Sequence, residues 1–441
     1  MKLRETRCEK IALTTLGCKA NWADTEAISQ ALARTGFEIV PFDSPADAYV
    51  VNTCTVTAVA NAQSRQMLRR ARRGSPNALI VATGCYGEVD RDEIAAIPGV
   101  DAVFGSKDRE ALIAYLCGKI DHPPLDPLPS REGRRGEGAV GPVPISRQSR
   151  ARAFLKIQDG CNRRCAYCIV PRARGRSRSM PFDDVLAACT QLSRDHREIL
   201  LAGIDIGQYG RDLPGRPSLS KLVSRLAAAQ GMARLRISSL DPSQIDERLI
   251  ELIALEIKIC RHVHLSIQSG SDAVLRSMAR GYRARDISRV ASELAARVPG
   301  IAITGDVIAG FPCETDAMHR ETADLLESLP IAGLHVFPFS VRDGTRAASM
   351  PDQVAAGVKK SRAAELRGIA RRARKKFLEG LIGEAFDVIL TSSDTEADGT
   401  VLAVADNAVK IKLPPGGAAY GGMARAILTE VRDLEAYGKW E

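Results

Sequence analysis

Residues 159–168 read Asp-Gly-Cys-Asn-Arg-Arg-Cys-Ala-Tyr-Cys and place three cysteines at the spacing Cys-x3-Cys-x2-Cys. Cysteine thiolates are the usual ligands of iron–sulfur clusters, and a cubane of four irons normally takes four of them. Three thiolates leave one iron without a protein ligand, and an open coordination position is what a metal site needs for chemistry. A zinc knuckle and a disulfide are the alternatives, but the second pair that zinc knuckles prefer does not follow. The stretch therefore predicts an open iron–sulfur cluster on Cys161, Cys165 and Cys168.

The bulk composition is that of a soluble globular protein. The chain has 441 residues, of which 45% are hydrophobic and 26% charged, and this length suits roughly two to four domains. It has no apolar run of about 18 residues and its N-terminus lacks the apolar core of a signal peptide, so we expect no membrane contact and a cytoplasmic location. Eleven cysteines in such a chain indicate reduced, metal-binding thiols rather than disulfides. The net charge of +9 favours a polyanionic partner such as nucleic acid, although a basic surface alone also fits it.

The N-terminal part, residues 8–120, alternates predicted strands and helices, which indicates a doubly wound parallel α/β domain. Three of its strands end in cysteine, at Gly17-Cys18, Thr53-Cys54 and Gly84-Cys85. In an open α/β sheet the ligand crevice lies beyond the carboxyl ends of the strands, so these cysteines can converge there. We expect them to hold a second iron–sulfur cluster, the alternative being three separately packed thiols. The remaining cysteines are expected to be structural: Cys8, Cys117, Cys189, Cys260 and Cys313.

Three further segments complete the chain. Residues 121–150 are rich in proline, glycine and arginine and are predicted to be a linker. Residues 151–376 contain about six strand-and-helix units, too few for a closed eight-unit barrel, so a six-unit partial barrel with an open side is expected. Residues 377–441 alternate short strands with Gly or Pro turns, which predicts a small all-β barrel.

Two features resemble known families. The Cys-x3-Cys-x-aromatic-Cys spacing, with Tyr167 before the last cysteine, resembles the radical S-adenosylmethionine (SAM) signature. The whole order of strand-end cysteines, linker, SAM core and small barrel resembles the methylthiotransferases, whose last domain is the RNA-binding TRAM barrel. The resemblance implies two [4Fe-4S] clusters, one that binds SAM through its open iron on Cys161, Cys165 and Cys168, and an auxiliary one that handles sulfur on Cys18, Cys54 and Cys85.

The candidate contacts to SAM itself are Tyr167 in the signature and four residues at the ends of barrel strands, where the loops of such barrels build sites. These four are Gly203, Gln268, Asp306 and Gly310. Gln268 and Asp306 can equally be strand-end caps. The family often has Gly-Phe-Pro-Gly-Glu-Thr near SAM, whereas residues 310–315 read Gly-Phe-Pro-Cys-Glu-Thr, so the backbone at Cys313 is expected to differ slightly.

The flanks of the strand-end cysteines indicate the substrate. Cys18-Lys19-Ala20-Asn21 and Cys54-Thr55-Val56-Thr57 resemble the branch that modifies N6-threonylcarbamoyladenosine beside the tRNA anticodon. The isopentenyladenosine branch usually has Asn-Thr-Cys-Ser-x-Arg, and the ribosomal-protein branch Cys-Pro-Lys-Asn. The resemblance thus implies methylthiolation of carbon 2 of that base in a tRNA anticodon stem-loop, with an external one-electron donor. The isopentenyl and ribosomal-protein activities remain alternatives, as does a non-catalytic iron–sulfur protein.

The expected contacts with RNA follow from the charges. From Phe377 to Glu441 five Lys or Arg stand against eleven Asp or Glu, a net charge of −6. A barrel that grips phosphates should be basic. We therefore expect RNA to bind at Arg65–Arg73, at the arginine run 163–178 and along the basic helix 354–376. The arginine run can also raise the potential of the adjacent cluster, because positive charge favours its reduced state.

Overall fold

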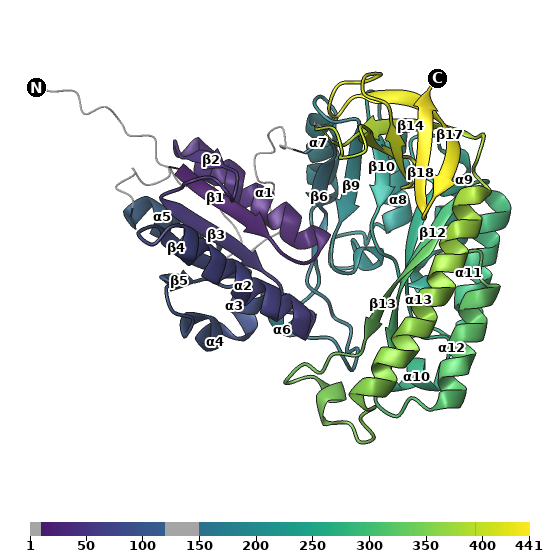
Figure 1. The fold of residues 1–441 in the computed structure, drawn as a ribbon, viewed down its shortest axis with the longest axis horizontal. Coiled ribbons are helices and arrows are strands. Elements are labelled where there is room, and N and C mark those ends of the chain that lie inside the picture. Colours follow the sequence, from purple (N-terminus) through teal and green to yellow (C-terminus); the bar gives the residue numbers. More distant parts are fainter. Residues whose placement is uncertain (1–9, 120–149, 393) are drawn as a thin grey trace, which may run out of the picture.

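The computed structural model describes residues 10–119, 150–392 and 394–441. Cys8 and the predicted linker, apart from Arg150, lie outside the described residues. Within these three ranges no helix is long and apolar enough to cross a membrane. The chain forms an N-terminal α/β domain, a central barrel of parallel strands, and a small β-barrel at its C-terminus (Figure 1).

The N-terminal domain is built on a five-stranded parallel sheet, as predicted. Its strands, in spatial order, are β2 (Glu38–Val40), β1 (Lys10–Thr15), β3 (Ala48–Thr53), β4 (Leu79–Gly84) and β5 (Ala102–Val103). All six residues of β3 are buried, because helices cover both faces of the sheet. Val50 packs with α1 (Lys19–Arg34) and α5 (Arg109–Lys119) on one face. Val51 packs on the other face with α2 (Ala58–Gly74), α3 (Cys85–Val89) and α4 (Arg91–Ala95).

The strand order reverses between β1 and β3. Chain segments leave these two strands toward opposite faces of the sheet, which opens the ligand crevice of such folds. Cys18 and Cys54 come just beyond β1 and β3, and Cys85 follows β4 directly. The topology therefore places all three strand-end cysteines at one edge of the sheet.

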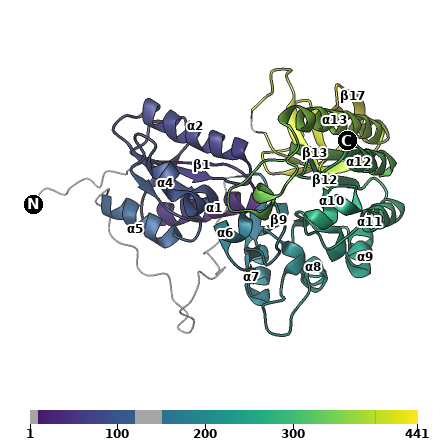
Figure 2. The same ribbon diagram turned by 90° about the horizontal axis from the view of Figure 1, so that it is seen from below.

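The central barrel has six parallel strands, which confirms the expected six-unit partial barrel. They are β6 (Ala153–Lys156), β9 (Glu198–Ala202), β10 (Arg234–Ile237), β11 (His262–Gln268), β12 (Ala302–Ala309) and β13 (Gly333–Pro338). Two three-stranded sheets meet through the parallel bridges Leu235–Ile259 and Leu240–Leu265. Helices α7 (Phe182–Leu192), α8 (Leu219–Ala227), α9 (Glu247–Leu255), α11 (Ala284–Arg297), α12 (Asp316–Ser328) and α13 (Ala356–Glu379) cover the outside (Figures 1 and 2).

The C-terminal segment closes into the predicted small β-barrel. Its strands are β14 (Ala385–Leu390), β15 (Val401–Ala405), β16 (Lys410–Leu413), β18 (Glu435–Trp440) and β17 (Met423–Arg432) in spatial order. Residues of all five strands form an apolar interior with Leu378 and Leu381: Phe386, Val388, Leu390, Val401, Ala403, Ala405, Ile411, Leu413, Ala426, Leu428 and Ala436.

Buried arginines join this small barrel to the amino ends of the central strands. At β10, Arg234 donates to the backbone oxygen of Asp387 at 2.8 Å, and Arg236 donates to that of Ala405 at 3.0 Å. Both guanidiniums also pair with the carboxylate of Glu198, which is fully buried. Burial acts to raise the pKa of Glu198, but the charges and hydrogen bonds of Arg236 and Arg234 hold it well below its usual range.

Replacing Glu198 by alanine should leave two buried arginines without their carboxylate. Removing one partner of a buried ion pair costs about 3–5 kcal/mol, so we expect a loss of that size in the free energy of unfolding, measured by urea denaturation. Glu293→Ala is the matched control, since Glu293 pairs with Arg289 on the exposed surface of α11, where such pairs contribute less than about 1 kcal/mol. Equal effects of the two changes would refute the structural role of Glu198.

Candidate iron–sulfur and substrate site

The three-cysteine loop follows β6 and the short strand β7 (Gln158–Asp159), at the carboxyl end of the central barrel. Backbone hydrogen bonds fix its path: Cys161 N donates to Gly175 O at 3.1 Å, and Ala166 N donates to Met278 O at 2.9 Å. Gly160 has a φ of 69°, and a β-carbon there would lie 2.0 Å from the carbonyl oxygen of Arg176. Only glycine fits this left-handed, crowded position, so the loop begins with a turn that aims the first cysteine inward.

Positive groups point at the sulfur atoms of this loop. Arg280 Nη1 donates to Cys165 Sγ at 3.2 Å, and the backbone N–H of Arg163 donates to Cys161 Sγ at 3.4 Å. Both arginines are held by Asp241, whose Oδ2 accepts from Arg163 at 2.7 Å and from Arg280 at 2.6 Å. These donors stabilise thiolates, which are the form that binds iron.

The thiols of the loop match what an iron–sulfur cluster requires. Burial, and then the charge of Asp205, raises the pKa of Cys161 to about 12, and burial raises that of Cys168 to about 11. Cys165 and Cys168 act on Cys161, so the three sulfurs lie close to one another. Without metal, burial therefore favours the neutral thiols of Cys161 and Cys168, and metal binding must release those protons. Three convergent sulfurs beside two arginines suit an anionic cluster.

The three strand-end cysteines also come together. A β-carbon at Gly17 would lie 2.6 Å from Cys54 Sγ, so the turn before Cys18 packs directly on Cys54. Burial, together with the charges of Cys18 and Cys54 and against the opposing charge of Arg174, raises the pKa of Cys85 to about 12. Cys54 and Cys85 are buried, whereas Cys18 is exposed. The set is thus exposed at Cys18, and its role as a ligand set for a second cluster stays a prediction.

One buried arginine connects the two cysteine sets. Arg174 ends α6 (Val170–Arg174), which begins two residues after the last loop cysteine. Its Nε donates to Cys85 Sγ at 3.2 Å, and its Nη1 donates to both oxygens of Asp159 at 3.0 and 3.1 Å. Its Nη2 contacts Asp24 at 2.8 Å and Asn21, both on α1. Asn21 in turn donates to the backbone oxygen of Thr53 at 3.0 Å, beside Cys54.

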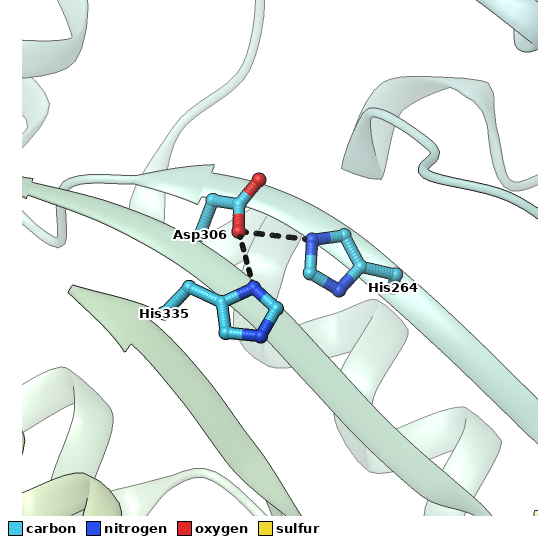
Figure 3. Close-up of side chains that lie close together, drawn as sticks. All are labelled: His264, Asp306 and His335. Atoms are coloured by element: carbon cyan, nitrogen blue, oxygen red, sulfur yellow. Dashed lines mark hydrogen bonds and ion pairs between the residues drawn. The ribbon is translucent and has the colours of Figure 1, made fainter. Parts of the chain in front are cut away.

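Three polar side chains of the central barrel, His264, Asp306 and His335, lie close together (Figure 3). Asp306 on β12 lies beside His335 on β13 in the strand register. The same carboxylate oxygen of Asp306 accepts from His264 Nε2 and from His335 Nδ1, both at 3.1 Å. Burial acts to raise the pKa of Asp306, but these hydrogen bonds outweigh it and hold the pKa well below its usual range. Thr304 extends the row by contacting His264 Nδ1 at 2.9 Å and His262 Nε2 at 3.2 Å.

His264, Asp306 and His335 are also close enough to hold a metal ion. Two observations favour the hydrogen-bonded arrangement instead. Both imidazoles already donate to one oxygen atom, and the positive charge of Lys19 acts on His335. A cation would be repelled there.

The matches to known protein families divide the chain in the same way as its domains do. A family model described as uncharacterized protein family UPF0004 matches residues 10–105, and the radical SAM superfamily model matches residues 155–326. The threonylcarbamoyladenosine tRNA methylthiotransferase MtaB of Bacillus subtilis is 39% identical over 91% of this chain and 89% of its own length. The MtaB of Aquifex aeolicus is 34% identical over 84% and 90%. The chain belongs to the radical SAM methylthiotransferase family.

Another relative and one solved structure are also similar to this chain. The tRNA-2-methylthio-N(6)-dimethylallyladenosine synthase of Carboxydothermus hydrogenoformans is 33% identical over 89% of this chain and 90% of its own. The radical S-adenosylmethionine methyltransferase TsrM of Kitasatospora setae has a TM-score of 0.54 at 16% identity and covers 77% of both chains, which shows a shared fold. As a radical SAM methylthiotransferase, the chain uses SAM and a [4Fe-4S] cluster.

The candidate SAM contacts ring the carboxyl end of the barrel. Tyr167 packs edge-on against Phe311 with ring centroids 6.5 Å apart. Gln268 ends β11 with a φ of 62°, and Gly310 follows β12 with a φ of 73°. Gly203 follows β9, where a β-carbon would lie 2.8 Å from the carbonyl oxygen of Gln158. Their positions suit SAM, and their contacts to it, like that of Asp306, stay predictions.

Cys313 has a φ of 65°. It therefore adopts the left-handed backbone conformation that explains why glycine is common at this position in the family. Cys313 thus takes the type of backbone conformation that a glycine would take at this position, so the cysteine does not require the difference in backbone that the sequence predicted. Its Sγ contacts the carbonyl oxygen of Pro351 at 3.5 Å, away from both cysteine sets.

Three residues near the SAM-binding loop were missed from the sequence. Asp205 accepts from Arg163 Nε at 2.8 Å and lies 3.6 Å from Cys161 Sγ. Its place two residues after Gly203, at a strand end, is a signal that could have found it. Asp241 and Arg280 carry no comparable local signal, because their contact with the loop depends on the folding of β10 and β11 against it.

The arginines of the loop differ in role. Arg163 is paired with two aspartates and Arg174 is buried, so neither is available to RNA. Arg164, Arg172 and Arg176 are exposed. On α13, Arg362 is buried against Glu314 and Asp316, and Arg372 pairs with Glu327. The basic surface open to RNA is therefore narrower than the sequence suggested.

Arg174→Gln should uncouple the two cysteine sets. The change leaves Asp159 and Asp24 without their shared guanidinium and removes the donor to Cys85 Sγ. We expect a lower melting temperature and a larger loss of methylthio product than of SAM cleavage, measured on the reconstituted enzyme. Arg172→Gln is the control, since Arg172 lies exposed on the same short helix. If Arg174→Gln forms as much methylthio product per SAM cleaved as the wild-type enzyme, this role is contradicted.

Proposed function

We propose that this protein methylthiolates carbon 2 of N6-threonylcarbamoyladenosine in the anticodon stem-loop of tRNA. The observation that carries the proposal is that Arg174, which follows the loop cysteines on the central domain, donates to Cys85 Sγ of the strand-end set and also binds Asp159 and Asp24, so that it ties the two cysteine-bearing segments together. A radical SAM protein that only cleaves SAM needs one set. The relatives named for this activity match nearly the whole chain, which supports the same function.

In this proposal both cysteine sets hold [4Fe-4S] clusters: Cys161, Cys165 and Cys168 the one that binds SAM, and Cys18, Cys54 and Cys85 the auxiliary one. When bound, the first supplies the electron that splits SAM to a 5′-deoxyadenosyl radical, and the second supplies sulfur. An external donor provides that electron, and the reaction takes place in the cytoplasm. Tyr167, Gly203, Gln268, Asp306 and Gly310 are the proposed SAM contacts.

Residues outside the two cysteine sets hold these sets in place relative to each other. Arg280 keeps a positive charge beside Cys165 Sγ, the backbone N–H of Arg163 donates to Cys161 Sγ, and Arg174 donates to Cys85 of the strand-end set. A further contact joins the two domains, since Arg342 Nη2 of the central domain donates to Thr55 Oγ1 of the N-terminal domain at 2.5 Å. The two domains thus close on the open side of the barrel, where a base must enter.

The base has to turn out of the anticodon loop before its carbon 2 can react inside the barrel, as is usual for enzymes that act on a base. Exposed apolar side chains near the domain contact suit such a base: Val56 and Val59 on the N-terminal domain, and Phe337 and Val341 on the central one. Ala58 N donates to Ser340 Oγ at 3.0 Å, so these segments are neighbours. The TRAM-like domain, residues 377–441, is proposed to contact the same RNA farther from the base.

The isopentenyl substrate of related enzymes is less suited to this barrel. Its inner face carries His264, Asp306 and His335, with Lys19 close by. An apolar prenyl group would bury these polar groups without offering them a hydrogen bond, which is costly. The lining therefore favours a polar substituent on the adenine.

Cys54→Ala should separate the two halves of the reaction. The loop cysteines remain, so 5′-deoxyadenosine should still form under reducing conditions, whereas mass spectrometry of tRNA nucleosides should show no 2-methylthio product. Iron should fall from about eight to about four per chain, as expected for two four-iron clusters. Wild-type enzyme should convert N6-threonylcarbamoyladenosine fully by the same assay. Absence of product from wild-type enzyme would refute the function, and loss of deoxyadenosine in Cys54→Ala with its loop cluster intact would refute the division.

The salt dependence of tRNA binding should identify the electrostatic contacts. Replacing Arg164 and Arg176 by glutamine should reduce the slope of log K against log salt by about 0.7 for each phosphate that is no longer neutralised. The contrasting pair is Arg425→Gln and Lys439→Gln on the small barrel, which should leave the slope unchanged because that barrel is net acidic. If the substitutions in the small β-barrel reduce the slope and those in the loop do not, the small β-barrel makes the electrostatic contacts with the tRNA.

A further inference from the structure

The strand register defines which side chains face the inside of the central barrel. Ile199 and Leu201 on β9 pack outward with Leu235 on β10 in the apolar layer under the helices. The alternate residues, among them Glu198 and Arg236, therefore face inward, since successive side chains of a strand alternate. The same rule and the contacts of Figure 3 place the following residues inside: Lys156, Arg236, His262, His264, Thr304, Asp306 and His335. The inside of this barrel is thus unusually polar.

One of the charges near this interior comes from the other domain. Lys19 is the first residue of α1 and follows Cys18 directly. Helix α1 contacts β6 and β9, and its Asp24 pairs with Lys156 inside the barrel. The charges that act on Lys19 are those of Arg236, Arg152, Asp306 and Cys18, while Lys19 in turn acts on His262 and His335. Because α1 packs on β6 and β9, Lys19 therefore lies between Cys18 at the edge of the N-terminal sheet and the polar side chains of the barrel.

The ammonium group of Lys19 is not paired with a carboxylate in the described part of the chain. Within residues 10–119, 150–392 and 394–441 it makes no hydrogen bond and no ion pair. Asp306, whose charge is felt at Lys19, already accepts from His264 and His335 through one oxygen. Glu198 is shared by Arg152, Arg234 and Arg236. Positive charge thus exceeds negative charge where the substituent of the adenine would lie.

A partly buried ammonium without a hydrogen-bond partner is costly, and an anionic group brought by the substrate would remove that cost. The substituent of N6-threonylcarbamoyladenosine carries a carboxylate, whereas the prenyl substituent of related substrates carries none. Carbon 2 and carbon 6 of adenine both adjoin N1, so the substituent on carbon 6 lies on the same side of the ring as the reacting carbon. A cation one residue from Cys18 is therefore well placed to meet it.

We propose that Lys19 selects the substrate by binding the carboxylate of the threonylcarbamoyl group, while the neighbouring Cys18 set faces carbon 2. The inference rests on the proposed function and adds the residue that determines specificity. His335 supplies a second polar group, because its side chain is 69% exposed and only its Nδ1 is engaged by Asp306. An apolar substituent would leave Lys19 unpaired, and a site built for a polar group rejects an analogue that lacks it.

The test compares three versions of one anticodon stem-loop on the reconstituted enzyme: with N6-threonylcarbamoyladenosine, with its methyl ester, and with unmodified adenosine. Loss of one partner of a buried charge pair weakens binding at least about 30-fold. Wild-type enzyme should therefore bind the acid at least about 30-fold more tightly than the ester. The ester changes only the ligand, so this arm does not depend on the folding of a variant.

The protein arm uses Lys19→Gln, which should bind acid and ester equally, and Lys19→Arg, which should keep most of the preference. Lys10→Gln, on the exposed start of β1, is the control and should bind like wild type. Iron content and SAM cleavage without tRNA should be unchanged in Lys19→Gln, which shows that the adjacent Cys18 still holds its cluster. If wild type binds the ester as tightly as the acid but still forms the methylthio product, the role of Lys19 is refuted and the function stands. If wild type forms no product from the acid, the function itself fails.

Discussion

The arrangement of this enzyme depends on the burial of one guanidinium group. Arg174 is only 2% exposed, and a charge in that position is tolerated only when it is paired and hydrogen-bonded. Its partners come from both domains: Asp159 before the SAM-binding loop, and Asp24 and Asn21 on α1. Burial acts to lower its pKa, but the charges of Cys85 and the two aspartates raise the pKa well above its usual value. The group stays charged at every physiological pH, so the domains are held together by a contact that does not titrate.

This contact decides the geometry of the chemistry. A barrel of six strands leaves one side open, and the N-terminal domain covers that side with α1, which contacts β6 and β9. The strand-end cysteines are therefore held against the central domain through Arg174, which donates to Cys85 Sγ. In the proposed mode of substrate recognition, Lys19 of the other domain adds a positive charge to the polar row of Figure 3. Neither domain alone contains both a radical source and a surface that recognises the substrate.

Much of the fold and the cysteine sets could be predicted because their signals are local. Buried strands such as Ala48–Thr53 are continuous apolar runs, and their ends are marked by the cysteines themselves. The arginine run was less informative, because sequence cannot show which of Arg172 and Arg174 points inward. That choice is made by Asp24, which lies 150 residues away in the chain. The polar row was also hidden, since His264, Asp306 and His335 meet only through the pairing of three strands.

The position of the small β-barrel follows from the same interior arginines and bears on how RNA is held. Arg234 and Arg236 attach the barrel at the amino end of β10, whereas the SAM-binding loop lies at the carboxyl end of β6. Parallel strands of four to eight residues separate these ends, which is roughly 13–26 Å at about 3.3 Å per residue. A flipped base cannot span that distance, but a stem that carries it can. An acidic barrel so far from the base is suited to contact the RNA by shape, while the exposed arginines of the loop provide the electrostatic attraction next to the reacting base.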